Sequence, residues 1–173
     1  EKKDGKPYTL YTDGLKIHVP IDSRMQQYAE QAVDEHIKNY LQPRFFKSKK
    51  NKKNAPYDNL SAEEIEASLT RAMKQSERYR LMDNAGMSMA AIRDTFNTKM
   101  PMQIYSYERG LVDTLLSPMD SIRYYKHFLR CGFMSMDPRT GHVKAYVGGP
   151  DYSHFQYDMV TQGRRQVGST IKP

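Results

Sequence analysis

Ser169 and Lys172 are the two residues of this sequence whose types and spacing predict covalent chemistry. A serine hydroxyl is a weak nucleophile until a neighbouring base takes its proton. A lysine can act as that base once burial or a nearby cation lowers its pKa. Residues three apart on a helix lie one above the other on the same face. A helix over this stretch would therefore bring the amine to the hydroxyl, and the pair predicts acyl transfer through an ester of the serine.

The residues beside Ser169 predict that it lies at the start of a helix. Pro173 has no N–H and clashes with the carbonyl four residues back, so a helix that contains it begins near Thr170. The serine would then face free N–H groups and the positive end of the helix dipole, which stabilise an oxyanion. Gly168 lets the backbone approach a substrate closely. The alternative is an ordinary helix start with a solvated lysine, because this spacing also arises by chance.

The charge of the chain is concentrated in one short run. The net charge is +7, and the ten residues 44–53 carry six cations and no anion. We interpret this run as a solvated, mobile loop between helices, with contact to an anionic lipid or polymer as the alternative. A nucleic-acid-binding protein would interleave basic and aromatic residues across a folded face. The sequence therefore predicts no nucleic-acid partner.

Other features limit the cofactor and the compartment. No apolar run is long enough to span a bilayer and no signal peptide is visible, so we expect a membrane anchor outside this sequence. Cys131 is the single cysteine, which excludes an internal disulfide and predicts a buried structural thiol. The five histidines are scattered, so neither a metal nor a cofactor is expected. Because the chain stops just after the candidate site, we expect it to be a piece of a longer protein.

An amphipathic strand and a helix are expected near the N-terminal end. Residues 14–21 alternate between apolar and polar, which predicts a half-buried strand. Asp22 or Ser23 can begin the helix that follows, and Ser23 with Gln26 has the form of a capping box. Apolar residues then recur at helical spacing until Pro43, where we expect the helix to end.

The later elements predict an α+β fold, with helices packed on short antiparallel hairpins. Helix-capping and turn residues mark their boundaries. We expect a helix from Ser61 that ends before Gly86, a shorter helix from Ser88, a hairpin of 102–107 and 111–116, a helix from Ser117 to Gly132, and a hairpin of 133–136 and 142–147.

Two stretches resemble class A penicillin-binding proteins. Gly-Gly-x-Asp-Tyr at 148–152, Phe155 and Arg-Gln-x-Gly-Ser-x-x-Lys-Pro at 165–173 resemble the start of their transpeptidase domain. Residues 14–33 resemble the segment that joins their glycosyltransferase and transpeptidase domains. The sequence as a whole is most similar to Bacteroidetes members. It departs at Val167, where many members have proline.

The resemblance implies a domain organisation. Residues 1–130 would be a linker or pedestal between the two catalytic domains, and residues 131–173 the N-terminal start of the transpeptidase (penicillin-binding) domain. That domain would be an incomplete serine-transpeptidase fold of the penicillin-binding protein and β-lactamase type. The family's Ser-x-Asn and Lys-Thr-Gly motifs and its glycosyltransferase domain lie outside this sequence. We therefore expect the isolated chain to be inactive.

The resemblance also implies a peptidoglycan synthase of the inner (cytoplasmic) membrane whose catalytic domains face the periplasm. Ser169 would be the acyl nucleophile toward a D-Ala-D-Ala stem peptide, and Lys172 the general base. An amine of a neighbouring stem would resolve the acyl-enzyme and form the cross-link, and β-lactams would acylate the same serine. The implied partners are peptidoglycan stem peptides, glycan strands derived from lipid II, β-lactams and other cell-wall synthesis proteins.

Two alternatives remain open at this point. The chain could be a non-catalytic linker or interaction module that positions cell-wall synthase domains, because residues 1–130 carry no evident chemistry. It could also belong to a β-lactamase or β-lactam sensor, which use a serine and a lysine at the same spacing. The strand and helix upstream favour the synthase, since a single-domain hydrolase has no use for such a connector.

Overall fold

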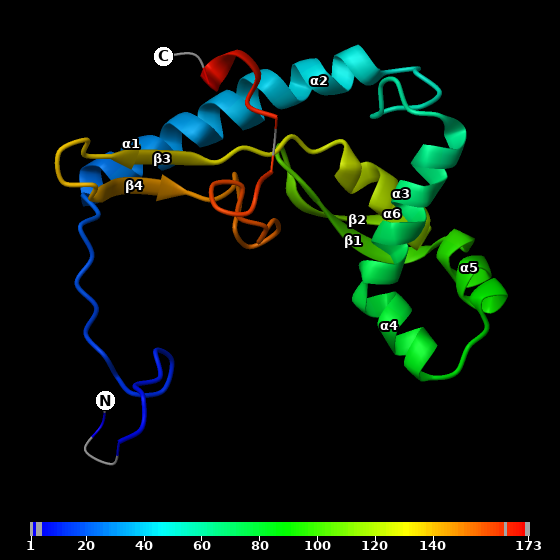
Figure 1. The fold of residues 1–173 in the computed structure, drawn as a ribbon. Helices are drawn as coiled ribbons and strands as arrows, with labels where there is room; N and C mark the ends of the chain where they lie inside the picture. The colour runs from blue at the N-terminus through cyan, green and yellow to red at the C-terminus, as the bar shows by residue number, and fades with distance from the viewer. Residues whose placement is uncertain (1, 3–4, 165, 172–173) are drawn as a thin grey trace.

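The computed structural model describes residues 2, 5–164 and 166–171 (Figure 1). The helical elements are α1 (Ser23–Asp34), the π-helical segment η1 (Glu35–Leu41), α2 (Gln42–Lys49), α3 (Ala62–Gln75), α4 (Glu77–Asn84), α5 (Met89–Asn97), α6 (Pro118–Lys126) and the 3-10 helix η2 (Gly168–Ile171). The strands are β1 (Met100–Ser106), β2 (Gly110–Leu116), β3 (Phe133–Met136) and β4 (Val143–Val147). β1 pairs with β2 and β3 with β4, both antiparallel. This mixture of helices and short antiparallel sheets agrees with the predicted α+β class.

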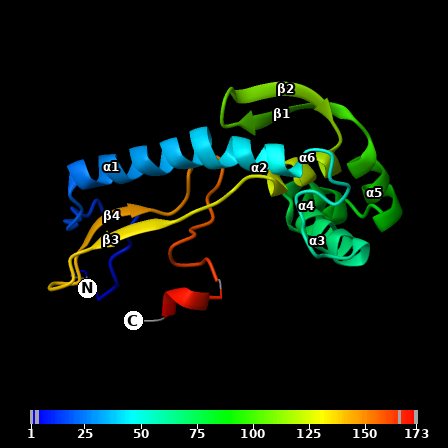
Figure 2. The same cartoon turned by 90° about the horizontal axis from the view of Figure 1, so that it is seen from above.

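A single long helix runs through α1, η1 and α2 and carries the other elements (Figures 1 and 2). β3 and β4 lie beside α1, whereas α3 to α6 and the β1–β2 hairpin gather near α2. Asp22 caps the helix, because its carboxylate accepts from the backbone N–H groups of Arg24 and Met25 at 2.9 and 3.1 Å. The predicted capping box is wrong: Gln26 reaches instead to the backbone of Tyr146.

The predicted end of this helix at Pro43 is also wrong. The helix continues to Lys49, and the residues just before the proline form the π-helical turn, in which Gln42 N–H bonds to the carbonyl of Ile37, five residues back. The wider turn gives the proline ring room and makes its missing N–H less costly.

The cationic run is partly ordered, which corrects the predicted mobile loop. Its first part belongs to α2, where the Arg44 guanidinium lies 3.8 Å from the centre of the Tyr40 ring. Lys49 is buried and forms an ion pair with Asp58. The following loop therefore supplies one counter-charge to a run that has none of its own.

No strand forms over residues 14–21, contrary to the prediction. The alternating apolar side chains of Leu15, Ile17 and Val19 are 40 to 62% exposed. Alternation favours a strand only where a partner strand or a core covers the apolar face. No such partner lies against this stretch among the residues that the structure describes.

The helical unit of α3 to α6 has its own core. The Ser61–Glu64 capping box forms as predicted. The single helix expected from Ser61 is divided at Ser76, whose hydroxyl oxygen accepts from Tyr79 N–H and starts α4. A cluster of buried apolar residues holds the unit together: Leu69, Met73, Ile92, Phe96 and Met119.

Two glutamines attach the long helix to the rest of the fold. Gln26 donates to the carbonyl of Tyr146 at 2.9 Å and accepts from its N–H at 2.7 Å, which fixes α1 on β4. Gln42 donates to the carbonyl of His127 and accepts from the N–H of Leu129, both at 2.8 Å. Gln42 thus takes the place of the backbone partners that the His127 carbonyl and the Leu129 N–H would have if α6 continued. It accounts for α6 ending at Lys126 and not at the predicted Gly132.

Candidate acyl-transfer site and the segment that leads to it

Ser169 is exposed and lies in η2. Gly168 before it has φ +53°, a left-handed conformation that glycine adopts at little cost. The Thr170 start is predicted for a helix that contains Pro173, and this proline lies outside the described residues, whereas η2 spans Gly168–Ile171. Lys172 lies outside the described residues, so its role as the base of Ser169 remains a prediction.

Phe155 holds the segment between β4 and Ser169 in an aromatic cluster. Its side chain is 4% exposed and packs with the buried rings of Tyr105 and Phe128. The ring centroids lie 6.0 Å from Tyr105 and 5.4 Å from Phe128, and the Arg130 guanidinium lies 4.5 Å from the Phe155 ring centre. The partner aromatics come from β1 and from α6 with the residues after it, so Phe155 joins the segment to that unit.

Asp151 organises the turn that carries Phe155. Its carboxylate accepts from His154, whose Nδ1 lies at 3.1 Å and whose backbone N lies at 3.2 Å. The His154 ring stacks on the Tyr105 ring with centroids 3.9 Å apart. Burial acts to raise the pKa of Asp151, but the nearby Tyr105 hydroxyl and the bonds from His154 outweigh it and leave that pKa below its usual range. Burial, followed by the nearby Asp151 carboxylate, raises the pKa of Tyr105, so the phenol stays neutral.

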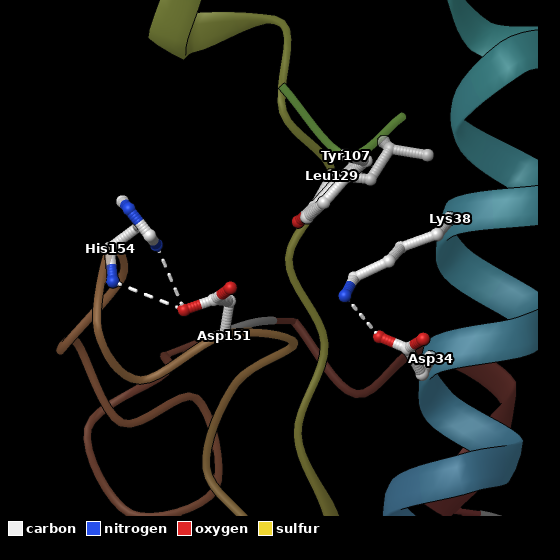
Figure 3. Close-up of polar contacts among 6 residues, drawn as sticks. All are labelled: Asp34, Lys38, Tyr107, Leu129, Asp151 and His154. Atoms are coloured by element: carbon white, nitrogen blue, oxygen red, sulfur yellow. Dashed lines mark hydrogen bonds and ion pairs between the residues drawn. The ribbon is translucent and has the colours of Figure 1, made fainter. Parts of the chain in front are cut away.

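Figure 3 shows Asp151 and His154 on their loop, with the long helix and Tyr107 across from them. On the helix, Lys38 forms an ion pair with Asp34, and its amine lies 5.8 Å from the Tyr107 ring centre. The segment before Ser169 therefore contacts β1 through His154 and faces the polar side chains of the long helix across a hollow.

Asp158 fixes the next part of the segment. Its carboxylate accepts from the Tyr146 hydroxyl, from the Thr161 hydroxyl at 2.5 Å and from the N–H of Val160 at 2.9 Å. These donors, first Thr161 and then Tyr146, lower the pKa of Asp158 to about 2. A Cβ on Gly132 would lie 2.8 Å from Val160, so the turn packs closely on the start of the β3–β4 hairpin.

Two of the hollows among the described residues lie beside α1. A polar one of about 860 Å³ lies between α1 and the segment after β4, with Asp34, Asp151 and Asp158 in its lining. An apolar one of about 960 Å³ lies between the helix and β3 and includes Cys131, a half-buried free thiol whose pKa is raised by burial. Ser169 lines neither hollow.

Neither a metal centre nor a membrane span is found in the described part of the chain. No three or more histidine, cysteine, aspartate or glutamate side chains gather there as a metal would need. None of the helices there combines the length and the apolarity of a membrane span.

The sequence reasoning missed the bonds between Asp151 and His154 and the stacking of His154 on Tyr105. Two sequence features could have indicated this turn: the Gly-Gly-x-Asp-Tyr motif, and the spacing of three between the aspartate and the histidine, which suits a turn closed by the carboxylate. Nothing in the local sequence pairs either residue with a tyrosine more than forty positions earlier.

Comparisons with known proteins identify the family. Residues 52–129 match the family model of the penicillin-binding protein middle domain. The chain is 30% identical to penicillin-binding protein 2D of Bacillus subtilis (strain 168), over 91% of the chain and 20% of that protein. It is 29% identical to penicillin-binding protein 1A of Rickettsia conorii and 26% identical to that of Escherichia coli K12, over 94 and 95% of the chain and 22% of each relative.

No solved structure matches the chain. It spans about a fifth of the length of the curated relatives, and its alignment with them runs over nearly all of its own residues. The chain therefore belongs to the penicillin-binding proteins, with their middle domain over residues 52–129.

Proposed function

We propose that the chain is part of a peptidoglycan synthase, a serine-type D-Ala-D-Ala transpeptidase that cross-links stem peptides through an acyl-enzyme on Ser169. One observation carries the proposal: the serine of the Gly-Ser-x-x-Lys-Pro motif is exposed, in a short helix, after a glycine with left-handed backbone. The names of the relatives, which record penicillin binding, support it. Residues 131–173 would then begin the transpeptidase domain, and residues 1–130 would be the linker or pedestal that contains the middle domain.

The reaction begins when Lys172 takes the proton of the Ser169 hydroxyl. The Ser169 oxygen attacks the carbonyl of the penultimate D-Ala of a stem peptide, and the backbone N–H of Ser169 forms half of the oxyanion hole. Cleavage of the peptide bond releases the terminal D-Ala, whose amine takes up a proton. An amine of a second stem then attacks the ester, which forms the cross-link and regenerates the serine. A β-lactam acylates the same oxygen by opening of its ring.

The remaining parts of the proposed full-length protein are inferred from the resemblance to class A penicillin-binding proteins. It would include a glycosyltransferase that extends glycan strands from lipid II, an anchor in the inner membrane and catalytic domains in the periplasm. Its partners would be stem peptides, glycan strands, β-lactams and other cell-wall synthesis proteins. No nucleic acid and no cofactor are part of the proposal.

Labelling of the full-length natural protein with a fluorescent penicillin tests the proposal. We expect one label per molecule, on the peptide that contains Ser169, and no label after Ser169→Ala. Ser48→Ala, which removes an exposed serine of α2, should label like the wild type. Label on another residue, or unchanged labelling of the Ser169→Ala variant, would refute the proposal. Rapid release of hydrolysed penicillin would instead indicate a β-lactamase.

The long helix favours a second, compatible role as a positioning module. Two of its glutamines, Gln26 and Gln42, bind the backbone of β4 and of the residues after α6, and neither has a part in the chemistry. If this role were the whole function, the full-length protein would show no covalent label with penicillin at all.

A further inference from the structure

We propose that the end of α2 and the turns that follow it form a docking surface for an anionic phospholipid bilayer. We call this surface the α2 basic face; it consists of Phe46, Lys47, Lys50, Lys52 and Lys53. None of these residues takes part in the proposed acyl transfer. The inference therefore goes beyond the proposed function and does not depend on it.

The α2 basic face concentrates the positive charge of the whole chain. Residues 44–53 carry six cations and no anion, out of a net charge of +7. The four lysines of the face are exposed, and in the part of the chain that the structure describes none of them forms an ion pair. Asp58 pairs with the buried Lys49 and acts on Lys52 only through space. An external anionic surface would supply the counter-charge that the fold lacks here.

The lysines are held on ordered backbone. Lys50 N–H donates to the carbonyl of Lys47, in the last turn of α2, at 3.4 Å. Lys52 N–H donates to the Lys49 carbonyl at 3.2 Å and Ala55 N–H to the Lys52 carbonyl at 3.1 Å, so the chain continues in consecutive turns at the outer edge of the molecule (Figure 1). The helix dipole favours cations only within the last turn, so it does not account for the lysines after the helix.

An exposed aromatic ring lies among these charges. Phe46 is 38% exposed, although its ring stacks on His127 and meets Phe128 edge-on, with centroids 6.1 Å apart in both pairs. Phe46, Lys47 and Lys50 stand at helical spacing and line one hollow of about 770 Å³. The α2 basic face therefore combines amines, their alkyl chains and an anchored apolar ring.

This combination fits a bilayer better than a charged polymer. Lysine amines can bind lipid phosphates while their alkyl chains and a phenylalanine ring reach the boundary of the acyl chains. A polymer such as polyphosphate would engage the amines and leave Phe46 in water. Asp120, the carboxylate that lines the same hollow, does not oppose the lipid charge, because it is paired with Arg123 at 3.1 Å.

The test measures binding of the whole 173-residue chain to vesicles by co-sedimentation. One set of vesicles is phosphatidylcholine alone, and the other is an equimolar mixture of phosphatidylcholine and phosphatidylglycerol. Lys47→Gln with Lys50→Gln removes two charges of the α2 basic face. Lys74→Gln with Lys99→Gln is the matched control, because it removes two exposed lysines outside the face and changes the net charge equally.

We expect the chain to bind the anionic vesicles and not the neutral ones. The loss of Lys47 and Lys50 should lower the partition coefficient about 25-fold, since each lysine near an anionic surface contributes a factor of about five. The control pair should lower it less than about threefold. Raising the salt from about 0.1 M to about 1 M should release the chain, because the screening length shortens from about 10 Å to about 3 Å.

A variant of Phe46 separates a bilayer from a polymer. The chain contains no tryptophan, so the emission of Phe46→Trp reports on this position alone. We expect anionic vesicles to shift the emission to shorter wavelength and lipids with brominated acyl chains to quench it. Polyphosphate should do neither, because it offers no apolar phase to the ring.

Three results would overturn the inference: no binding to the anionic vesicles, equal losses for the two lysine pairs, or binding without a tryptophan shift, which would indicate a surface for anionic polymers. Far-UV circular dichroism shows whether each variant is folded. If Phe46→Trp does not fold, the lysine pairs decide, because their side chains are exposed. None of these results bears on the labelling of Ser169, so a failure here is distinct from a failure of the proposed function.

Discussion

Replacing Gln42 with leucine should destabilise the fold more than its single side-chain amide suggests. The side chain is 2% exposed, and its amide satisfies two backbone groups, the carbonyl of His127 and the N–H of Leu129, both at 2.8 Å. Leucine fills a similar volume, so the packing is largely kept while both backbone groups lose their partners. An unsatisfied buried polar group costs about 1–3 kcal/mol, and two of them that are partly reached by water should together cost about 2–4 kcal/mol.

Urea unfolding of the purified chain, followed by far-UV circular dichroism, measures this change. We expect the midpoint to fall and the slope to stay constant, because the surface exposed on unfolding is unchanged. Hydrogen exchange gives a local readout, since the Leu129 amide should lose its protection first. Gln31→Leu is the control: this glutamine lies on the same helix, is exposed and donates to Glu35 at 2.9 Å. Equal losses for both variants would refute the reasoning.

Two further predictions concern the anchor at Asp158 and the helical core. Because the pKa of Asp158 is lowered from 3.8 to about 2, its carboxylate stabilises the fold above about pH 4, and this contribution is lost as the pH falls from about 4 to 2. The melting temperature of the wild type should therefore fall more steeply over that range than that of Asp158→Asn, and parallel curves would contradict this. Met73→Ala, at a side chain that is 0% exposed, should cost about 2–5 kcal/mol in urea unfolding. Met134→Ala, at 44% exposure, should cost about 0.5 kcal/mol or less, and similar losses would show that burial does not set the cost.

Elements that depend on neighbouring residues could be predicted from the sequence. The Ser61–Glu64 capping box forms because its donors and acceptors lie within one turn of each other. The hairpin of β1 and β2 forms around Gly110, whose φ of +68° suits the turn. Both features depend only on residues that are close in the chain.

Elements that depend on a distant partner could not be predicted. Gln26 has the spacing of a capping residue, but the exposed backbone edge of Tyr146, 120 residues later, binds its amide instead. The alternation of residues 14–21 predicts a strand, but no partner strand pairs with it among the described residues. Pro43 would end a helix of regular spacing, and only the π-helical turn before it, which the sequence does not reveal, lets the helix continue.

The same long-range contacts close a ring that includes the segment before Ser169. Gln42 attaches the long helix to the residues after α6, and α6 holds Tyr105 in place. The Tyr105 ring stacks on the ring of His154, which donates to Asp151. The loop of Asp151 is bonded to the turn of Asp158, and that turn is bonded to Tyr146 of β4. Gln26 returns from Tyr146 to the long helix. In a closed ring each link limits the movement of the others, so the course of the chain toward Ser169 depends on polar side chains that have no part in the proposed chemistry.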